Sequence, residues 1–127
     1  MLEEILSIKP AFTDKRGLIY NVLGHPIEHV AVIVTHRGAV RGNHVHEREI
    51  QYCYILRGRV RCEAVAVHPA TPGANAREVQ DARSGDLIIT PPGVAHKRTY
   101  LAATIEIALY TVPRLQMENE DTFPFEV

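Results

Sequence analysis

The stretch GAVRGNHVHEREIQYCYILRG, from Gly38 to Gly58, joins a histidine pair to a run of aromatic and aliphatic residues. The run IQYCYIL is typical of a β-strand. His44 and His46 are separated by one residue, and side chains at positions i and i+2 of a strand point to the same face. Both imidazoles therefore project together from backbone positions roughly 6 to 7 Å apart, which suits two ligands of one metal. A lone H-x-H pair is more often structural, so the surrounding residues decide what it means.

The rest of the chain consists of short strand-like runs separated by turn signals such as HRG, RSGD and PPG. The predicted strands cover residues 29–36, 50–56, 59–67, 86–90 and 103–112. Residues 68–82, which include His68, are expected to form a long loop. Many short strands at near-regular spacing predict an all-β sandwich or small barrel.

The composition bounds the class of protein. The chain has 127 residues, the size of one domain, with 46% apolar residues and a net charge of -1. This charge gives no reason to expect nucleic acid or a membrane surface as partner. The first ten residues, MLEEILSIKP, carry acids where a signal peptide needs bases, so we expect a cytoplasmic protein without a membrane span.

The chain has two cysteines, Cys53 and Cys62. If Arg57 and Gly58 form a two-residue hairpin loop, the two cysteines lie opposite each other on paired strands. A reduced, buried pair is the expected state, and a redox-sensitive pair is the alternative.

Two glycine- and histidine-containing motifs carry a family resemblance. The first runs from Gly38 through His44, His46 and Gln51 to Gly58, and the second runs from Gly85 through Pro91 and Gly93 to His96 and Tyr100. At these spacings the chain resembles the cupin superfamily, whose motifs are G-x5-H-x-H-x3,4-E-x6-G and G-x5-P-x-G-x2-H-x3-N. The resemblance implies a jelly-roll, double-sheet β-barrel. It implies one cupin domain over residues 1–127, with a barrel core at about 29–112, and a homodimer.

The same resemblance implies a ligand set. Metal-binding cupins hold Mn, Fe, Ni, Zn or Cu with residues that correspond here to His44, His46, Gln51 and His96. Gln51 stands where the motif has Glu, and Tyr100 stands where it has Asn. A neutral amide leaves more positive charge on the metal than a carboxylate does, which increases its Lewis acidity. The expected cofactor is one divalent transition metal (Mn, Ni, Fe or Zn).

A second resemblance favours chemistry without a metal. The segment VRGNHVHEREIQ (residues 40–51) resembles the nucleotide-sugar 3,4-ketoisomerases, and FTDKRGLIY (residues 12–20) resembles the opening that they share with deoxysugar 3,5-epimerases. In those enzymes a histidine of the H-x-H pair is the base beside a keto group, and the nearby arginine, here Arg41, holds the nucleotide-sugar. The ketoisomerases also place a tyrosine on the preceding strand, which HVAVIVTH (residues 29–36) lacks.

Other residues are candidates for the site. Arg41 can clamp a phosphate or carboxylate, or be a solvated loop cation. Glu106 is a catalytic acid or base if it faces inward and a surface residue if it faces outward, which is the expected orientation. Of Lys97 and Arg98, the one that faces inward can bind an anionic substrate.

Three functions fit these observations. The first is an enzyme that uses one divalent metal as a Lewis acid on a small, oxygen-rich, carbohydrate-like substrate, in isomerase or epimerase chemistry. The alternative is a metal-free nucleotide-sugar isomerase or epimerase with His44 or His46 as base. The third is a non-catalytic cupin that senses a small ligand or a metal.

Overall fold

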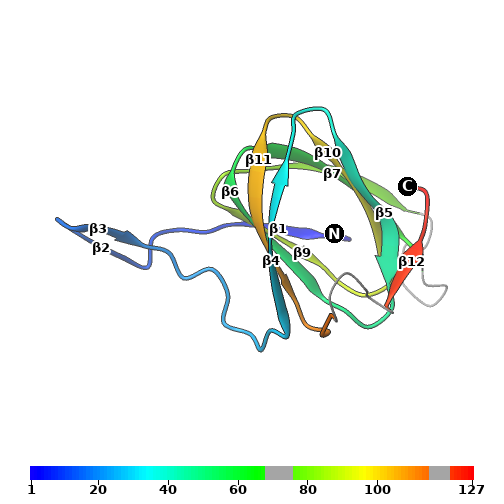
Figure 1. The fold of residues 1–127 in the computed structure, drawn as a ribbon, viewed down its shortest axis with the longest axis horizontal. Coiled ribbons are helices and arrows are strands. Elements are labelled where there is room, and N and C mark those ends of the chain that lie inside the picture. Colours follow the sequence, from blue (N-terminus) through cyan, green and yellow to red (C-terminus); the bar gives the residue numbers. More distant parts are fainter. Residues whose placement is uncertain (68–75, 115–120) are drawn as a thin grey trace.

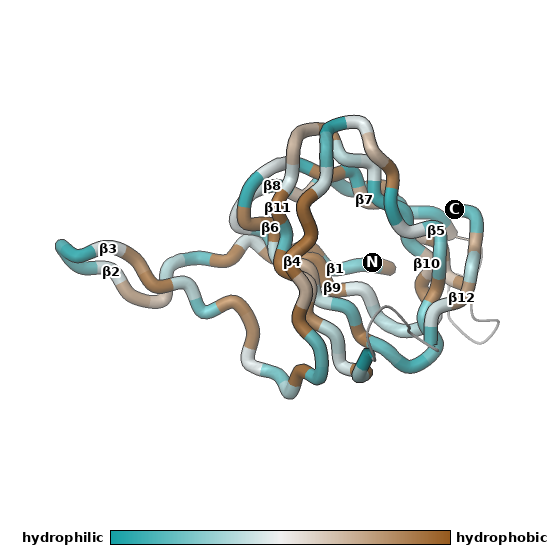
Figure 2. The backbone as a smooth tube through the Cα atoms, in the orientation of Figure 1, coloured by the Kyte–Doolittle hydropathy of each residue, from teal (hydrophilic) through white to brown (hydrophobic). Residues whose placement is uncertain are grey.

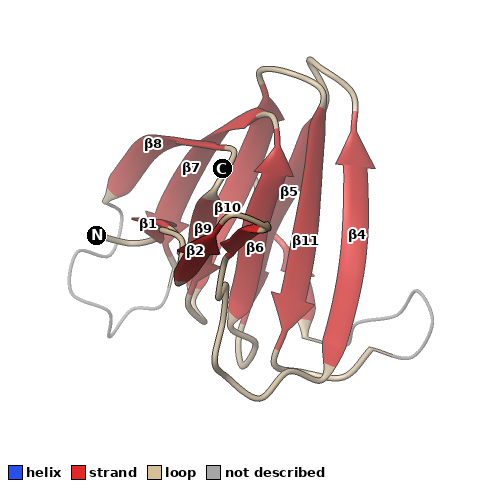
Figure 3. Ribbon diagram, turned by 90° about the vertical axis from the view of Figure 1, so that its left-hand side faces the viewer, coloured by secondary structure: helices blue, strands red, loops and turns tan. Residues whose placement is uncertain are grey.

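The computed structural model describes residues 1–67, 76–114 and 121–127. Within them every regular element is a β-strand, and no helix that could cross a membrane is present there (Figures 1 and 3). The strands are β1 (Glu4–Ser7), β2 (Phe12–Asp14), β3 (Gly17–Ile19), β4 (His29–Thr35), β5 (Val40–His46), β6 (Gln51–Arg57), β7 (Arg59–Ala66), β8 (Arg77–Arg83), β9 (Asp86–Thr90), β10 (Val94–Tyr100), β11 (Thr104–Tyr110) and β12 (Thr122–Pro124).

Two five-stranded antiparallel sheets form the body of the protein. The first has the order β1-β9-β6-β11-β4, and the second has the order β12-β5-β10-β7-β8. The hairpin of β2 and β3 extends away from this body (Figure 1). This is the all-β, jelly-roll double-sheet barrel that the two motifs predict. β4 and β5 are joined by a turn but do not pair, so the barrel is open between them.

Side chains alternate clearly in β7, whereas β6 is buried at five consecutive residues, from Gln51 to Ile55. In β7, Val60, Cys62 and Ala64 are buried while Arg59 and Arg61 are exposed. Side chains alternate between the two faces of a strand, so β7 supplies the core with every second residue. Figure 2 shows the apolar segments concentrated in β4 and the strands near it.

The two cysteines are free and buried, as expected, but the hairpin that would place them opposite each other is not formed. β6 and β7 belong to opposite sheets, so Arg57 and Gly58 do not form a hairpin loop. Gly58 has φ +119, and a Cβ there would meet the Thr104 Cα atom at 2.7 Å, so only glycine fits this sharp crossing. Burial raises the pKa of Cys62 to about 12 and also raises that of Cys53, which disfavours the thiolate form that reacts.

Several strands lie outside the five predicted ranges, and two of them, β8 and β12, form the edges of the second sheet. Residues 77–83, expected within a loop, form β8 at the edge of the second sheet. The expected loop residue His68 lies outside the described residues. Near the C-terminus, β12 pairs with β5 directly opposite His44–His46. The tail therefore packs back onto the barrel beside the histidine pair.

A buried ion pair ties the N-terminal segment to the second sheet. The Arg98 guanidinium donates to both Glu3 carboxylate oxygens and also to the Thr90 hydroxyl at 3.1 Å. Arg98 is 4% exposed and Glu3 is 1% exposed. The two-pronged geometry and the additional hydroxyl satisfy charges that would otherwise be costly to bury.

We predict that Glu3→Gln lowers the free energy of unfolding by roughly 3–5 kcal/mol, because it leaves the Arg98 charge buried without its counter-ion. Urea unfolding measures the change. Asp14→Asn is the matched control, because Asp14 pairs with Arg16 in the exposed hairpin and its loss should leave the midpoint nearly unchanged. Equal midpoints for the Glu3→Gln protein and the wild type would contradict the structural role of this pair.

Candidate functional site

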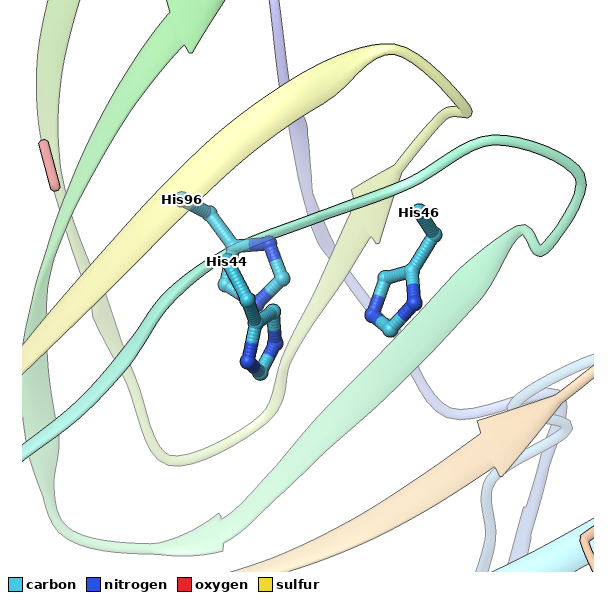
Figure 4. Close-up of side chains that lie close together, drawn as sticks. All are labelled: His44, His46 and His96. Carbon is cyan, nitrogen blue, oxygen red and sulfur yellow. The ribbon is translucent and has the colours of Figure 1, made fainter. Parts of the chain in front are cut away.

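Three histidines converge between the sheets. His44 and His46 lie on β5, and His96 lies on β10, directly opposite His44 in the strand register. Their ring centroids are 4.5 Å apart for His44 and His96, 4.9 Å for His44 and His46, and 5.9 Å for His46 and His96 (Figure 4). One nitrogen of each ring lies within 4.8 Å of the others.

A bulge in β5 allows this convergence. The register of β5 and β10 shifts between His96 and Lys97, and Gly42 and Asn43 both have positive φ, +91 and +56. A Cβ atom on Gly42 would lie only 2.6 Å from the His96 carbonyl oxygen, so the two backbones can approach only at a glycine. Bulges re-aim side chains next to functional sites, and this one precedes His44 directly.

Burial keeps the three imidazoles neutral. It lowers the pKa of His44 from 6.5 to about 4, with smaller contributions from His46 and Arg114. Burial also lowers the pKa of His46, and it lowers that of His96 well below 6.5. Within the described residues, the buried His44 Nε2 and His96 Nδ1 atoms have no hydrogen-bond partner. Buried polar atoms without partners are rare, so these two nitrogens mark a place for a bound group.

His46 is held from both sides. Its Nδ1 lies 3.2 Å from the Asp121 carbonyl oxygen and 3.2 Å from a Glu49 carboxylate oxygen. Both oxygens can only accept, which favours the tautomer with hydrogen on Nδ1 and directs the Nε2 lone pair toward the Gln51 Oε1 atom, 3.2 Å away. Two lone-pair donors at this separation suit adjacent ligands of one cation, with Glu49 behind them as the orienting carboxylate.

A cavity of about 350 Å³ connects the histidines to further polar groups. It lies between the two sheets and is lined by residues of β4, β5, β6, β10 and β11. Its lining consists of Ile33, Val40, Arg41, Gly42, His44, Gln51, His96, Arg98, Tyr100, Glu106 and Tyr110. Six of the eight candidate residues named from the sequence line it. Lys97 and His46 do not, but the His46 Nε2 atom lies 3.2 Å from Gln51 Oε1. Sequence reasoning missed Tyr100 and Tyr110, which lie on β10 and β11.

Arg41 spans the open side of the barrel. Its Nε donates to the Thr35 hydroxyl at 2.8 Å, and a terminal nitrogen donates to the Val34 carbonyl at 3.4 Å. The side chain thus runs from β5 to β4 while remaining exposed at the cavity mouth. Of the neighbouring pair Lys97 and Arg98, Arg98 faces inward, but Glu3 already neutralises its charge.

Glu106 faces inward, so the outward orientation expected from the sequence is wrong. It is 4% exposed and accepts a hydrogen bond of 2.7 Å from the Tyr100 hydroxyl. The expectation failed because β11 is apolar on its outer face. There Leu109 packs with Tyr52 and Tyr54 against residues of the N-terminal segment such as Val22 and Leu23. Tyr52 and Tyr54 accordingly point away from the histidines, as strand alternation predicts.

Comparison with known proteins fits this geometry. The family profile described as Cupin matches residues 27–98, more than half of the chain. The chain belongs to the cupin family. No curated protein matches it.

Solved cupin structures share the fold. The dTDP-4-dehydrorhamnose 3,5-epimerase from Sulfolobus tokodaii aligns with a TM-score of 0.75 and 20% identity, over 91% of this chain and 73% of that one. The 3'-monoepimerase ChmJ from Streptomyces bikiniensis, in complex with dTDP-quinovose, gives 0.78 and 19%, over 90% and 66%. The sugar 3,4-ketoisomerase QdtA from Thermoanaerobacterium thermosaccharolyticum, in complex with TDP, gives 0.73 and 16%, over 96% and 87%.

We predict that the chelator-treated cupin loses stability as the pH falls from about 6.5 to about 4. In this window the unfolded chain protonates His44 while the folded site, with its pKa lowered to about 4, does not. The unfolded state then binds more protons than the folded state, so the free energy of unfolding decreases as the pH decreases. Urea unfolding at several pH values measures the slope, and His44→Asn should make it shallower. An unchanged slope in that variant would contradict the neutral site.

Proposed function

We propose that this cupin is an isomerase or epimerase that acts on a keto sugar carried by a nucleotide. The supporting observation is the half-buried, neutral His44, whose buried Nε2 atom has no partner in the described residues and whose side chain lines the cavity. The epimerases and the ketoisomerase that share this fold carry out reactions of this class on nucleotide-linked sugars. The resemblance of residues 40–51 and 12–20 to such enzymes favours the same substrate class.

His44 is the proposed base. Its Nε2 takes a proton from the carbon next to the keto group, and the electrons of the broken C–H bond form a C=C bond as the carbonyl oxygen becomes an enolate. Delivery of a proton from water to the opposite face of that carbon, while His44 releases its own proton to solvent, gives epimerisation. Alternatively, the proton is returned to the former carbonyl carbon, and the hydroxyl on the neighbouring carbon loses its proton. The ketone then lies on that neighbouring carbon. The low pKa of His44 keeps the base form present at neutral pH.

Tyr110 is the proposed proton donor to the enolate oxygen. It lies on β11 opposite Gln51 in the strand register and lines the cavity with His44. It thereby replaces the tyrosine that the ketoisomerases carry on the strand before the histidines. Burial raises the pKa of Tyr110, so the phenol stays protonated, and the Arg114 guanidinium lies 3.4 Å from the ring centroid.

Arg41 is the proposed phosphate-binding group. It is exposed at the cavity mouth, where the charged part of a nucleotide-sugar would remain in contact with water. The structure pairs two of its nitrogens with Thr35 and Val34, which fixes the direction of the guanidinium. A planar guanidinium binds phosphate oxygens in pairs.

We predict that His44→Asn lowers kcat on TDP-4-keto-6-deoxyglucose by roughly 10²–10⁴-fold, because it removes the base. Tyr110→Phe should also lower kcat. Product formation followed by NMR measures both effects. His36→Asn changes an exposed histidine outside the cavity and should keep the wild-type rate. A His44→Asn protein as active as the wild type would overturn this assignment, and a wild type without turnover would favour a non-catalytic role.

A metal-dependent reaction is the second candidate, and the facing lone pairs of His46 Nε2 and Gln51 Oε1 favour it. The residues fit a divalent Mn, Ni, Fe or Zn ion, which His44, His46, Gln51 and His96 would hold. Such an ion would supply Lewis acidity toward a substrate oxygen. About one metal per chain in the tag-free protein, lost in His46→Ala, would support it. A protein that takes up none of these metals would reject it.

Two further expectations stay predictions. The homodimer follows from the cupin resemblance, and the cytoplasmic location is a prediction from the sequence.

A further inference from the structure

The cavity has a second polar end that proton transfer does not use. Tyr100 lies four residues beyond His96 on β10, and Glu106 lies four residues before Tyr110 on β11. At about 3.3 Å per residue, the backbone of this end is roughly 13 Å from that of the histidine end. The two side chains meet there, because the Tyr100 hydroxyl donates to the Glu106 carboxylate at 2.7 Å.

Glu106 is buried without a counter-ion. Across residues 1–67, 76–114 and 121–127, no lysine, arginine or histidine nitrogen forms an ion pair with its carboxylate. Arg41 lines the same cavity but bonds to Thr35 and Val34 instead. A buried carboxylate is costly unless hydrogen-bond donors surround it, and the Tyr100 hydroxyl is one such donor. The carboxylate lines the cavity, so a bound molecule can supply others.

We propose that Glu106 and Tyr100 form a hydroxyl-binding subsite for the sugar ring of the substrate. A carboxylate has about four acceptor positions, and Tyr100 occupies one of them and fixes the orientation of the group. The Glu106 carboxylate can accept hydrogen bonds from sugar hydroxyls, which are neutral donors. It repels a phosphate, which is negatively charged. The subsite rests on the proposed function and deepens it: the substrate carries free hydroxyls on the side of the ring away from the carbon that His44 deprotonates.

The subsite can be tested with free sugars, which need no nucleotide and no reaction. Saturation-transfer NMR on the full chain would measure binding of several hexoses and of their monodeoxy analogues. We expect the wild type to bind at least one hexose and to discriminate against an analogue that lacks a hydroxyl. Glu106→Gln should weaken hexose binding roughly tenfold and reduce this discrimination, because a charged acceptor is lost.

Three controls make the result specific. Glu63→Gln removes a carboxylate outside the cavity, where Glu63 pairs with Arg77, and should leave hexose binding unchanged. Tyr100→Phe keeps the carboxylate but removes its anchor, so it should reduce the discrimination while retaining part of the affinity. The thermal midpoint of each variant shows whether it is folded. A purely structural role for Tyr100 would lower the midpoint and leave the discrimination intact.

The outcomes separate the subsite from the proposed reaction. A wild type that binds none of the hexoses, or a folded Glu106→Gln protein that discriminates like the wild type, would overturn the subsite even if keto-sugar turnover is observed. Hexose discrimination that depends on Glu106 would support the subsite even if turnover is absent, in which case only the proposed reaction fails.

Discussion

The contact between the Gly42 backbone and the His96 carbonyl determines where the candidate site can form. β5 and β10 come close enough to bring His44 and His96 together only because residue 42 has no side chain and adopts positive φ. The bulge that follows turns His44 and His46 toward the space between the sheets. β12 then covers this part of β5, and the Asp121 carbonyl fixes the ring of His46.

Burial determines what the three imidazoles can do. Desolvation disfavours the imidazolium form of each ring, so the nitrogens keep their lone pairs at neutral pH. A metal and a substrate proton compete for the same lone pairs, and the geometry of His44 serves either. The cavity beyond the histidines adds Tyr110, Arg41 and the Tyr100–Glu106 pair, polar groups that suit an oxygen-rich substrate in either role.

Much of this site could be predicted from the sequence. The spacing within β5 and within the two glycine-containing motifs is short-range, and it was enough to identify His44, His46, Gln51 and His96. The partners that hold these residues come from distant segments. Asp121 is 75 residues from His46 in the sequence, and Glu3 is 95 residues from Arg98, so no local pattern reveals either contact. Glu106 was misjudged for a different reason. An apolar outer face normally indicates the core, but here it packs against the N-terminal segment, and the polar residue points inward.

Hydrogen isotope exchange tests the central claim most directly. The protein, treated with chelator, would be incubated with TDP-4-keto-6-deoxyglucose in D2O, and NMR would follow loss of the proton next to the keto group. We expect deuterium to enter this position without added metal and His44→Asn to abolish the exchange. Exchange that is absent after chelation and returns with an added divalent metal would contradict this expectation, as would exchange at the wild-type rate in His44→Asn.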